Sequence, residues 1–346
     1  MLCLIDPSLQ DHSGRSSDNL GDVVIYRSIA RCLEQLFPGE PIRRISSHVP
    51  LEAPHYEIMQ AARIIFLGGS NLLSSDVLTY NQWNFTSNPA DYDAPRFSNT
   101  VLFGVGWWQY QDPATPFTSD YYRRILCPRR LHSVRDSYTA ARLREAGIPN
   151  VVTTGCPSMW DLDGVISDRS VRWTQDCLLM LTDYYKHPSD DQRLLRTALD
   201  HFKGTIYFFP QGTGDVEYLG TLPAFAENFH RFQILEHSLD RLEVFLDRRP
   251  VTYLGTRLHG GIVAMNHRVP ALILGVDNRA TEMARDFHLP VVPRADQAAI
   301  EKWLQGTLKF PQIQVPREDI VRWRAQFAET NLPEGHGAPF GRAEAR

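Results

Sequence analysis

The segment 256–261 reads Thr-Arg-Leu-His-Gly-Gly and places Arg257 and His259 two residues apart. It directly follows the apolar run 251–255, and an apolar pattern with helical spacing begins at Ile262. Arg257 and His259 are therefore expected at a strand-to-helix turn, where free backbone N–H groups and the helix dipole favour an anion. A fixed cation beside a titratable ring predicts proton transfer on a phosphorylated or carboxylated substrate.

Two other polar turns follow predicted strands, at the sheet edge where open α/β folds bind ligands. Arg135 precedes a predicted helix, where an arginine is electrostatically unfavourable unless an anion or a carboxylate lies nearby. This placement predicts anion binding, with pairing to Asp136 as the structural alternative. Asn19, Gly21 and Asp22 precede the first helix and predict either a helix cap or a binding loop.

Glycines and polar residues after three more strands give weaker signals. Gly68 and Gly69 would let a ligand approach the backbone, but they form neither a dinucleotide fingerprint nor a P-loop. For Gly106, tight packing or turning is the interpretation that the sequence favours. Gln211 and Asp215 follow a further strand and are expected to line a cleft between two domains.

Short apolar runs alternate with helical patterns along the chain, which is typical of βαβ units and a parallel sheet. Helices are expected at about 24–37, 136–146 and 317–328. Strands are expected at 2–5, 42–46, 63–67, 101–105, 131–134, 151–153, 177–182, 205–209, 232–235, 251–254, 271–274 and 291–292. The polar segment 160–173 is a candidate linker. We therefore expect an α/β protein with two Rossmann-like domains, residues 1–165 and 166–332, and a disordered tail at 333–346.

Composition excludes several classes of protein. The chain has 346 residues, 43% hydrophobic and 22% charged, as expected for a globular protein. A net charge of −4 argues against non-specific nucleic-acid binding. The five cysteines are scattered, with no zinc spacing and no disulfide framework, which favours a cytoplasmic protein. No apolar stretch approaches the length of a membrane span.

Taken together, the ordered motifs resemble the polysaccharide pyruvyl transferase family. The matching pieces are Asn19-Leu20-Gly21-Asp22, Gly68-Gly69, Val134-Arg135-Asp136, Gly155, and Arg257-Leu258-His259-Gly260-Gly261-Ile262 with Pro270 and Asp277. The resemblance implies a GT-B-like glycosyltransferase fold with a cleft between its domains. It also implies that phosphoenolpyruvate donates a pyruvyl group, as a cyclic ketal, to two hydroxyls of a sugar in an exopolysaccharide, capsule or other cell-surface glycan precursor.

The same resemblance assigns roles to individual residues. It implies that His259, Arg257 and Arg135 are catalytic, with His259 as the general acid/base and the two arginines binding the donor anion. Substrate binding is assigned to Asn19, Gly21, Asp22, Gly68, Gly69, Leu258 and Gly260. The scheme needs no cofactor and no metal. The acceptor is a sugar or a lipid-linked oligosaccharide, and through that acceptor alone the protein would associate with a membrane.

Three residues depart from the family pattern, and two other functions stay open. Cys156 stands where many relatives have Asp, Arg279 where a lysine is common, and Asp18 where a glycine is frequent, which leaves the acceptor contacts undecided. One alternative is a nucleotide-sugar-dependent GT-B glycosyltransferase. The other is a catalytically silent glycan-binding scaffold.

Overall fold

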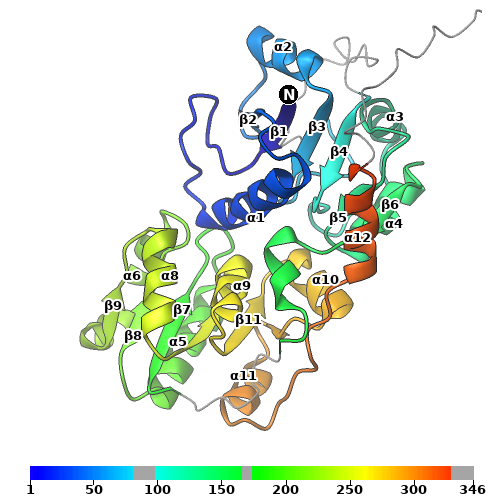
Figure 1. The fold of residues 1–346 in the computed structure, drawn as a ribbon. Coiled ribbons are helices and arrows are strands. Elements are labelled where there is room, and N and C mark those ends of the chain that lie inside the picture. The colour runs from blue at the N-terminus through cyan, green and yellow to red at the C-terminus, as the bar shows by residue number, and fades with distance from the viewer. Residues whose placement is uncertain (81–97, 166–173, 329–346) are drawn as a thin grey trace, which may run out of the picture.

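The protein is described from a computed structural model, in which residues 1–80, 98–165 and 174–328 are placed (Figure 1). Two parallel sheets dominate the fold. The first has the order β2-β1-β3-β4, formed by β1 (Leu2–Asp6), β2 (Ile42–Ser46), β3 (Ile64–Gly68) and β4 (Thr100–Phe103). A short parallel pair, β5 (His132–Val134) and β6 (Val151–Thr153), continues beyond β4 through a bridge between Val105 and Val134.

The second sheet has six parallel strands in the order β12-β11-β10-β7-β8-β9. They are β7 (Asp176–Met180), β8 (Ile206–Phe208), β9 (Phe232–Ile234), β10 (Val251–Gly255), β11 (Ala271–Gly275) and β12 (Val291–Pro293). Each of the twelve strands expected from the sequence forms, within one or two residues at its ends. That prediction rested on apolar runs, mostly of leucine and β-branched residues, which are bounded by turn residues. Strands of a parallel sheet have this pattern because both of their faces are buried.

Helices connect the strands and cover both sheets (Figure 1). In the first half they are α1 (Leu20–Leu36), α2 (Ala53–Ala61), α3 (Pro116–Ile125) and α4 (Ser137–Glu145). A 3-10 helix, η3 (Pro157–Leu162), opens the segment expected to be a linker. The second half has α5 (Pro188–His201), α6 (Asp215–Gly220), α7 (Pro223–Glu227), η4 (Phe229–Arg231), α8 (Leu239–Arg248), α9 (Leu258–Asn266), α10 (Asn278–Phe287), α11 (Gln297–Leu304) and α12 (Arg317–Ala325).

The last helix crosses back to the first half of the chain. Helix α12 packs on β5 and β6, and the Gln326 side chain accepts a hydrogen bond from the Leu131 backbone N–H at 2.8 Å. A boundary between domains near residue 165 stays a prediction. Residues 166–173 of the expected linker and the expected disordered tail lie outside the described residues.

One apolar cluster joins the two sheets. It contains the inward faces of α1 and α9, η3, and the α12 residue Trp323, and it reaches from Leu2 to Phe327. Of two further apolar clusters, one fills the outer side of the first sheet and the other fills the outer side of the second sheet. Helices α1 and α9 pack against each other and against η3, so the starts of α1 and α9 meet between the sheets.

Candidate functional site

Arg257 lies where the sequence places it, at the turn between β10 and α9, as the N-cap residue of α9. It is almost fully buried, and the hydroxyl of Tyr253 donates to its backbone carbonyl at 2.6 Å. Its guanidinium donates to both oxygens of Asp215 and, at 3.0 Å, to Asp183. The charge of Arg257 is therefore balanced within the protein, which favours a positioning role for its guanidinium over one of direct anion binding.

His259 lies in the first turn of α9 and is only 5% exposed. Its Nε2 atom is 3.7 Å from the Sγ of Cys156, which in turn lies 3.0 Å from the hydroxyl of Ser158. Its Nδ1 atom faces the start of α1, because a Cβ placed on Gly21 would lie 3.3 Å from it. Burial, reinforced by Arg279 and Arg135, lowers the pKa of His259 to about 3. The free protein therefore holds a neutral imidazole at neutral pH.

Arg135 follows β5 and is 1% exposed. One Nη2 hydrogen bond goes to the Oδ1 of Asn71, and Nε lies 3.3 Å from Asp136. Among the described residues, its buried Nη1 has no hydrogen-bond partner. Leaving such a donor unpaired costs about 1–3 kcal/mol, so an anion that accepts from Nη1 would be stabilised here.

Gly106 and Asp136 hold Arg135 in this position. A Cβ on Gly106 would lie 2.0 Å from Nη2, so only glycine leaves room for the guanidinium. The carboxylate of Asp136 caps α4 by accepting from the Thr139 N–H at 2.7 Å. Arg135 thus pairs with Asp136, as the structural alternative expects, and it still has an unused donor, so anion binding stays a prediction.

Arg279 is the main member of the site that motif-based reasoning did not assign. It lies in the first turn of α10, paired with Asp277, and its guanidinium donates to the Tyr184 hydroxyl at 2.6 Å. It also lowers the pKa of both His259 and Arg135, which places it in the same cluster. The available signal was its position, because Asp277 and Arg279 follow β11 at the same sheet edge as the other site residues.

The N-cap and first turn of α1 connect the two halves of the chain at this cluster. Asn19 caps α1 by accepting from the Gly21 N–H, and it also accepts from the Gln211 side chain, both at 3.1 Å. The Leu20 N–H donates to the Gln211 carbonyl at 2.9 Å. Asp22 accepts from Asn19, and burial raises the pKa of its carboxyl to about 6.

Four of the expected substrate-binding residues have a packing explanation. Cβ atoms on Gly68 and Gly69 would lie within 3.0 Å of α1 side chains, and one on Gly260 would lie 2.3 Å from the Met180 sulfur. Leu258 is a buried member of the central apolar cluster. Their role in binding stays a prediction, and close helix–sheet contact already accounts for them.

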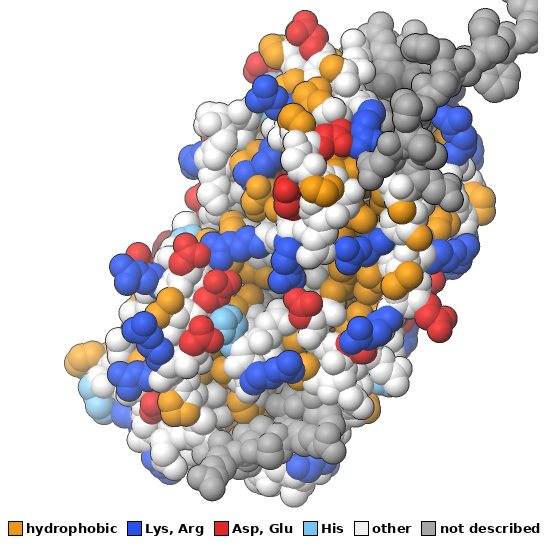
Figure 2. Space-filling model, viewed as in Figure 1, with side chains coloured by type: hydrophobic (Ala, Val, Ile, Leu, Met, Phe, Trp, Pro, Cys, Tyr) orange, Lys and Arg blue, Asp and Glu red, His pale blue; other side chains and the backbone are white. Residues whose placement is uncertain are grey.

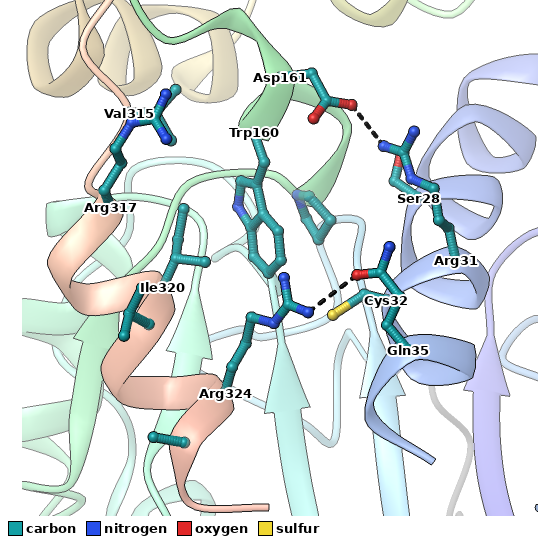
Figure 3. A pocket seen from close by; sticks show the side chains of 13 residues that line it. Ser28, Arg31, Cys32, Gln35, Trp160, Asp161, Val315, Arg317, Ile320 and Arg324 are labelled. Carbon is teal, nitrogen blue, oxygen red and sulfur yellow. Dashed lines mark hydrogen bonds and ion pairs between the residues drawn. The ribbon is translucent and has the colours of Figure 1, made fainter. Parts of the chain in front are cut away.

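A cavity of about 640 Å³ lies between α1, η3 and α12, and none of the residues of the His259 cluster lines it (Figure 3). The arginines around it already have partners. Arg31 donates to Asp161 at 2.7 Å, and Arg324 donates to Gln35 at 3.0 Å, as the dashed lines in Figure 3 indicate. Basic and acidic side chains intermingle on this face of the molecule (Figure 2). These two arginines of the cavity are therefore paired, whereas Arg135 in the His259 cluster keeps a hydrogen-bond donor without a partner among the described residues.

Two further observations concern other kinds of site. Within residues 1–80, 98–165 and 174–328, no group of three His, Cys, Asp or Glu side chains could hold a metal ion. In the same part of the chain, no helix is both long and apolar enough to cross a membrane.

Solved structures with the same fold come from nucleotide-sugar enzymes. The UDP-GlcNAc 2-epimerase of Methanocaldococcus jannaschii, in complex with UDP-GlcNAc and UDP, aligns with a TM-score of 0.54 at 10% identity, covering 94% of this chain and 99% of its own. The epimerase of Rickettsia bellii gives 0.51 at 12% identity, covering 95% and 96%. These likenesses show the GT-B fold that the sequence predicts, with its two layered α/β halves.

A family model gives the more specific result. No curated protein matches the chain in sequence. The model described as polysaccharide pyruvyl transferase matches residues 19–278, which is well over half of the chain. The matched stretch begins at the Asn19 cap of α1 and ends at the start of α10, so it includes Arg135, Arg257 and His259 and stops one residue before Arg279. The chain belongs to the polysaccharide pyruvyl transferase family.

Proposed function

We propose that the protein transfers the pyruvyl group of phosphoenolpyruvate to two hydroxyls of one sugar residue in a cell-surface polysaccharide precursor, forming a cyclic ketal and releasing phosphate. The observation that carries the proposal is the buried, unpaired Nη1 of Arg135 beside a neutral His259. Phosphoenolpyruvate carries both a phosphate and a carboxylate, which are the groups that arginine binds best.

Arg135 and Arg279 are the proposed donor-binding cations. Arg135 has a free donor, whereas Arg279 shares its charge with Asp277 and lies over the ring of Tyr184 at 5.7 Å. Each charge-assisted contact would contribute roughly 1.5–3 kcal/mol. Arg257, already paired with Asp183 and Asp215, is assigned to holding the start of α9 and therefore His259.

His259 is the proposed proton donor to the methylene carbon of phosphoenolpyruvate. Two arginines and burial keep the free imidazole neutral, so the ring must gain a proton before it can act as an acid. A bound donor anion would offset the arginine charges and raise the pKa of His259. Binding of phosphoenolpyruvate should therefore be coupled to proton uptake.

The reaction then balances without a metal or a redox partner. One sugar hydroxyl attacks the central carbon of phosphoenolpyruvate and loses its proton, while the methylene carbon gains the proton from His259 and becomes a methyl group. The His259 ring recovers a proton from the attacking hydroxyl. The second hydroxyl attacks the same carbon as the carbon–oxygen bond to phosphate breaks, and its proton leaves with phosphate.

The remaining partners follow from this reaction. The acceptor is a sugar or a lipid-linked oligosaccharide, and any contact with a membrane would be made through that acceptor. We place the protein in the cytoplasm because its five cysteines are all buried free thiols.

Turnover of phosphoenolpyruvate with a panel of p-nitrophenyl glycosides tests this function. The wild-type protein should release phosphate and produce a ketal methyl signal in the proton NMR spectrum. His259→Asn should lower turnover by about 10²–10⁴-fold, the usual contribution of general acid–base catalysis, while phosphoenolpyruvate still binds. Arg135→Gln should weaken donor binding instead. Turnover of UDP-sugars in place of phosphoenolpyruvate would contradict the proposal.

A further inference from the structure

A pocket of about 410 Å³ lies beside the proposed donor site, between the loop after β4 and the start of α10. Two segments of the chain contribute both to this pocket and to the proposed donor site. The first segment runs from Gly106, which packs under Arg135, to Tyr110, which lines the pocket. In the second, Asp277 lines the pocket and pairs with Arg279. A ligand in this pocket would therefore lie next to a bound donor.

Asn278 lines the pocket and has a buried hydrogen-bond acceptor that is not used within the described residues. Its side chain is only 2% exposed, and its Nδ2 donates to the Trp107 carbonyl at 3.1 Å. That bond fixes the amide, and the opposite Oδ1 has no partner among the described residues. An unpaired buried carbonyl costs free energy that a ligand hydroxyl would recover.

Tyr110 gives the same pocket an aromatic wall that is already held in place. Its side chain is 56% exposed, yet its hydroxyl donates to the buried Glu282 at 2.6 Å. Its ring also makes an edge contact with Tyr138, at 5.2 Å between centroids. A ring fixed at two points loses little conformational entropy when it binds a flat apolar surface.

Apart from Asp277, the other described residues of the lining are apolar or uncharged. Val276, Ala284 and Val291 contribute hydrocarbon, and Thr281 and Gln109 contribute neutral polar groups. Among the residues that the structure describes, the lining has no lysine or arginine, and its one carboxylate, Asp277, already pairs with Arg279. This chemistry suits an uncharged ligand with both hydroxyl groups and an apolar C–H face.

We propose that this pocket binds a neutral pyranose residue of the acceptor glycan, adjacent to the residue that receives the pyruvyl group. One sugar hydroxyl donates to Asn278 Oδ1, and the C–H face of the ring lies against Tyr110. This inference rests on the proposed function in one respect only, which is that the bound sugar is part of the acceptor glycan. His259 and Arg135 do not line the pocket, so the bound residue lies beside the reacting one.

Saturation-transfer NMR on the full chain tests the pocket without requiring turnover. The probes are lactose, cellobiose and the p-nitrophenyl glycosides of glucose, galactose, mannose and N-acetylglucosamine. Tyr110→Ala and Asn278→Leu should each weaken binding of the preferred sugar about tenfold, the loss expected for one aromatic face or one buried hydrogen bond. Phe229→Ala is the matched control, because Phe229 is also an exposed aromatic residue but does not line the pocket.

Loss of sugar binding in Tyr110→Ala with retention in Phe229→Ala would support the inference, even if Asn278→Leu failed to fold. It would be overturned by equal sugar binding in wild type and Tyr110→Ala, or by no sugar binding in the wild type. Calorimetric binding of phosphoenolpyruvate, measured separately, tests the donor site. Failure there, with sugar binding intact, would count against the proposed function alone.

Discussion

At the scale of single residues, burial is the main reason why the pKa of His259 is low, and its charged neighbours add to the effect. Cys156 places a thiol 3.7 Å from Nε2, and a buried thiol is uncharged because burial also raises its own pKa. The other charged groups that act on the ring are Arg279, Arg135 and Asp277. Burial lowers the pKa of His259 most, the two cations lower it further, and neither Asp277 nor the uncharged thiol offsets them.

Replacing that thiol with a carboxylate should change the titration. In Cys156→Asp, a negative charge near Nε2 would stabilise the imidazolium and raise the pKa of His259 from about 3. The protonated fraction at pH 5 would then increase. Cys156→Ser is the control, because a hydroxyl replaces the thiol without charge. Imidazole nitrogen chemical shifts measured from pH 3 to 8 would report both values, and identical titrations of the two variants would refute this explanation.

From the sequence, His259 and Arg135 could be predicted as site residues, but not the full set of charges around them. Arg135 directly follows a predicted strand and His259 lies a few residues beyond one, and their roles stay predictions. Arg279 was noticed only as a departure from a family pattern, since nothing local in the sequence reveals that β11 lies next to β10. The pairing of Arg257 with Asp183 and Asp215 is likewise tertiary, because three different strand ends supply the three residues.

At the scale of elements, the start of α1 touches the start of α9 through a glycine. A Cβ on Gly21 would lie 2.7 Å from the Gln211 amide nitrogen and 3.3 Å from His259 Nδ1. Alanine is otherwise favoured over glycine in a helix by roughly 0.5–1 kcal/mol. A substitution of Gly21 by alanine would therefore favour the helix but displace the Gln211 and His259 side chains.

Gly21→Ala should leave the unfolding free energy within about 1 kcal/mol of wild type, because the gain in propensity offsets displacement of a flexible amide. Turnover should fall at least tenfold, since His259 and Gln211 must shift. Gly220→Ala, at the end of α6, is the control, as a Cβ there meets nothing within 4 Å. Denaturant unfolding and phosphate release measure the two effects. Full activity in Gly21→Ala would show that this contact does not matter.

The strands were predictable to within one or two residues because apolar runs bounded by turn residues specify buried parallel strands. The helix expected at 24–37 begins earlier, at Leu20, because Asn19 caps it before its apolar pattern starts. Aromatic residues gather between positions 80 and 110, where Trp107 is fully buried and Tyr80 stacks on Trp108 at 4.0 Å between ring centroids. Only Tyr110 keeps a largely exposed ring among those described, and Trp83 and Phe85 lie outside the described residues.

At the scale of the whole molecule, two parallel sheets bring their carboxyl edges to one place. Residues far apart in the sequence, such as Asn19 and Gln211, meet there. Ion pairs such as Arg27 with Asp240 also connect the halves on the surface. This arrangement explains how residues from six or more separate turns come together in the cluster around His259. The course of α12 back to β5 and β6 could not be foreseen, because a helical pattern does not indicate which sheet the helix covers.

The proposed reaction protonates the methylene carbon of phosphoenolpyruvate as the sugar ketal forms. Carrying out the reaction in D₂O, with the acceptor that gives turnover, tests it most directly. The expected products are phosphate and a ketal methyl group that carries one deuterium, because the His259 proton exchanges with solvent. A ketal methyl group without deuterium would contradict His259 as the proton source. Phosphate release with no ketal would contradict pyruvyl transfer itself.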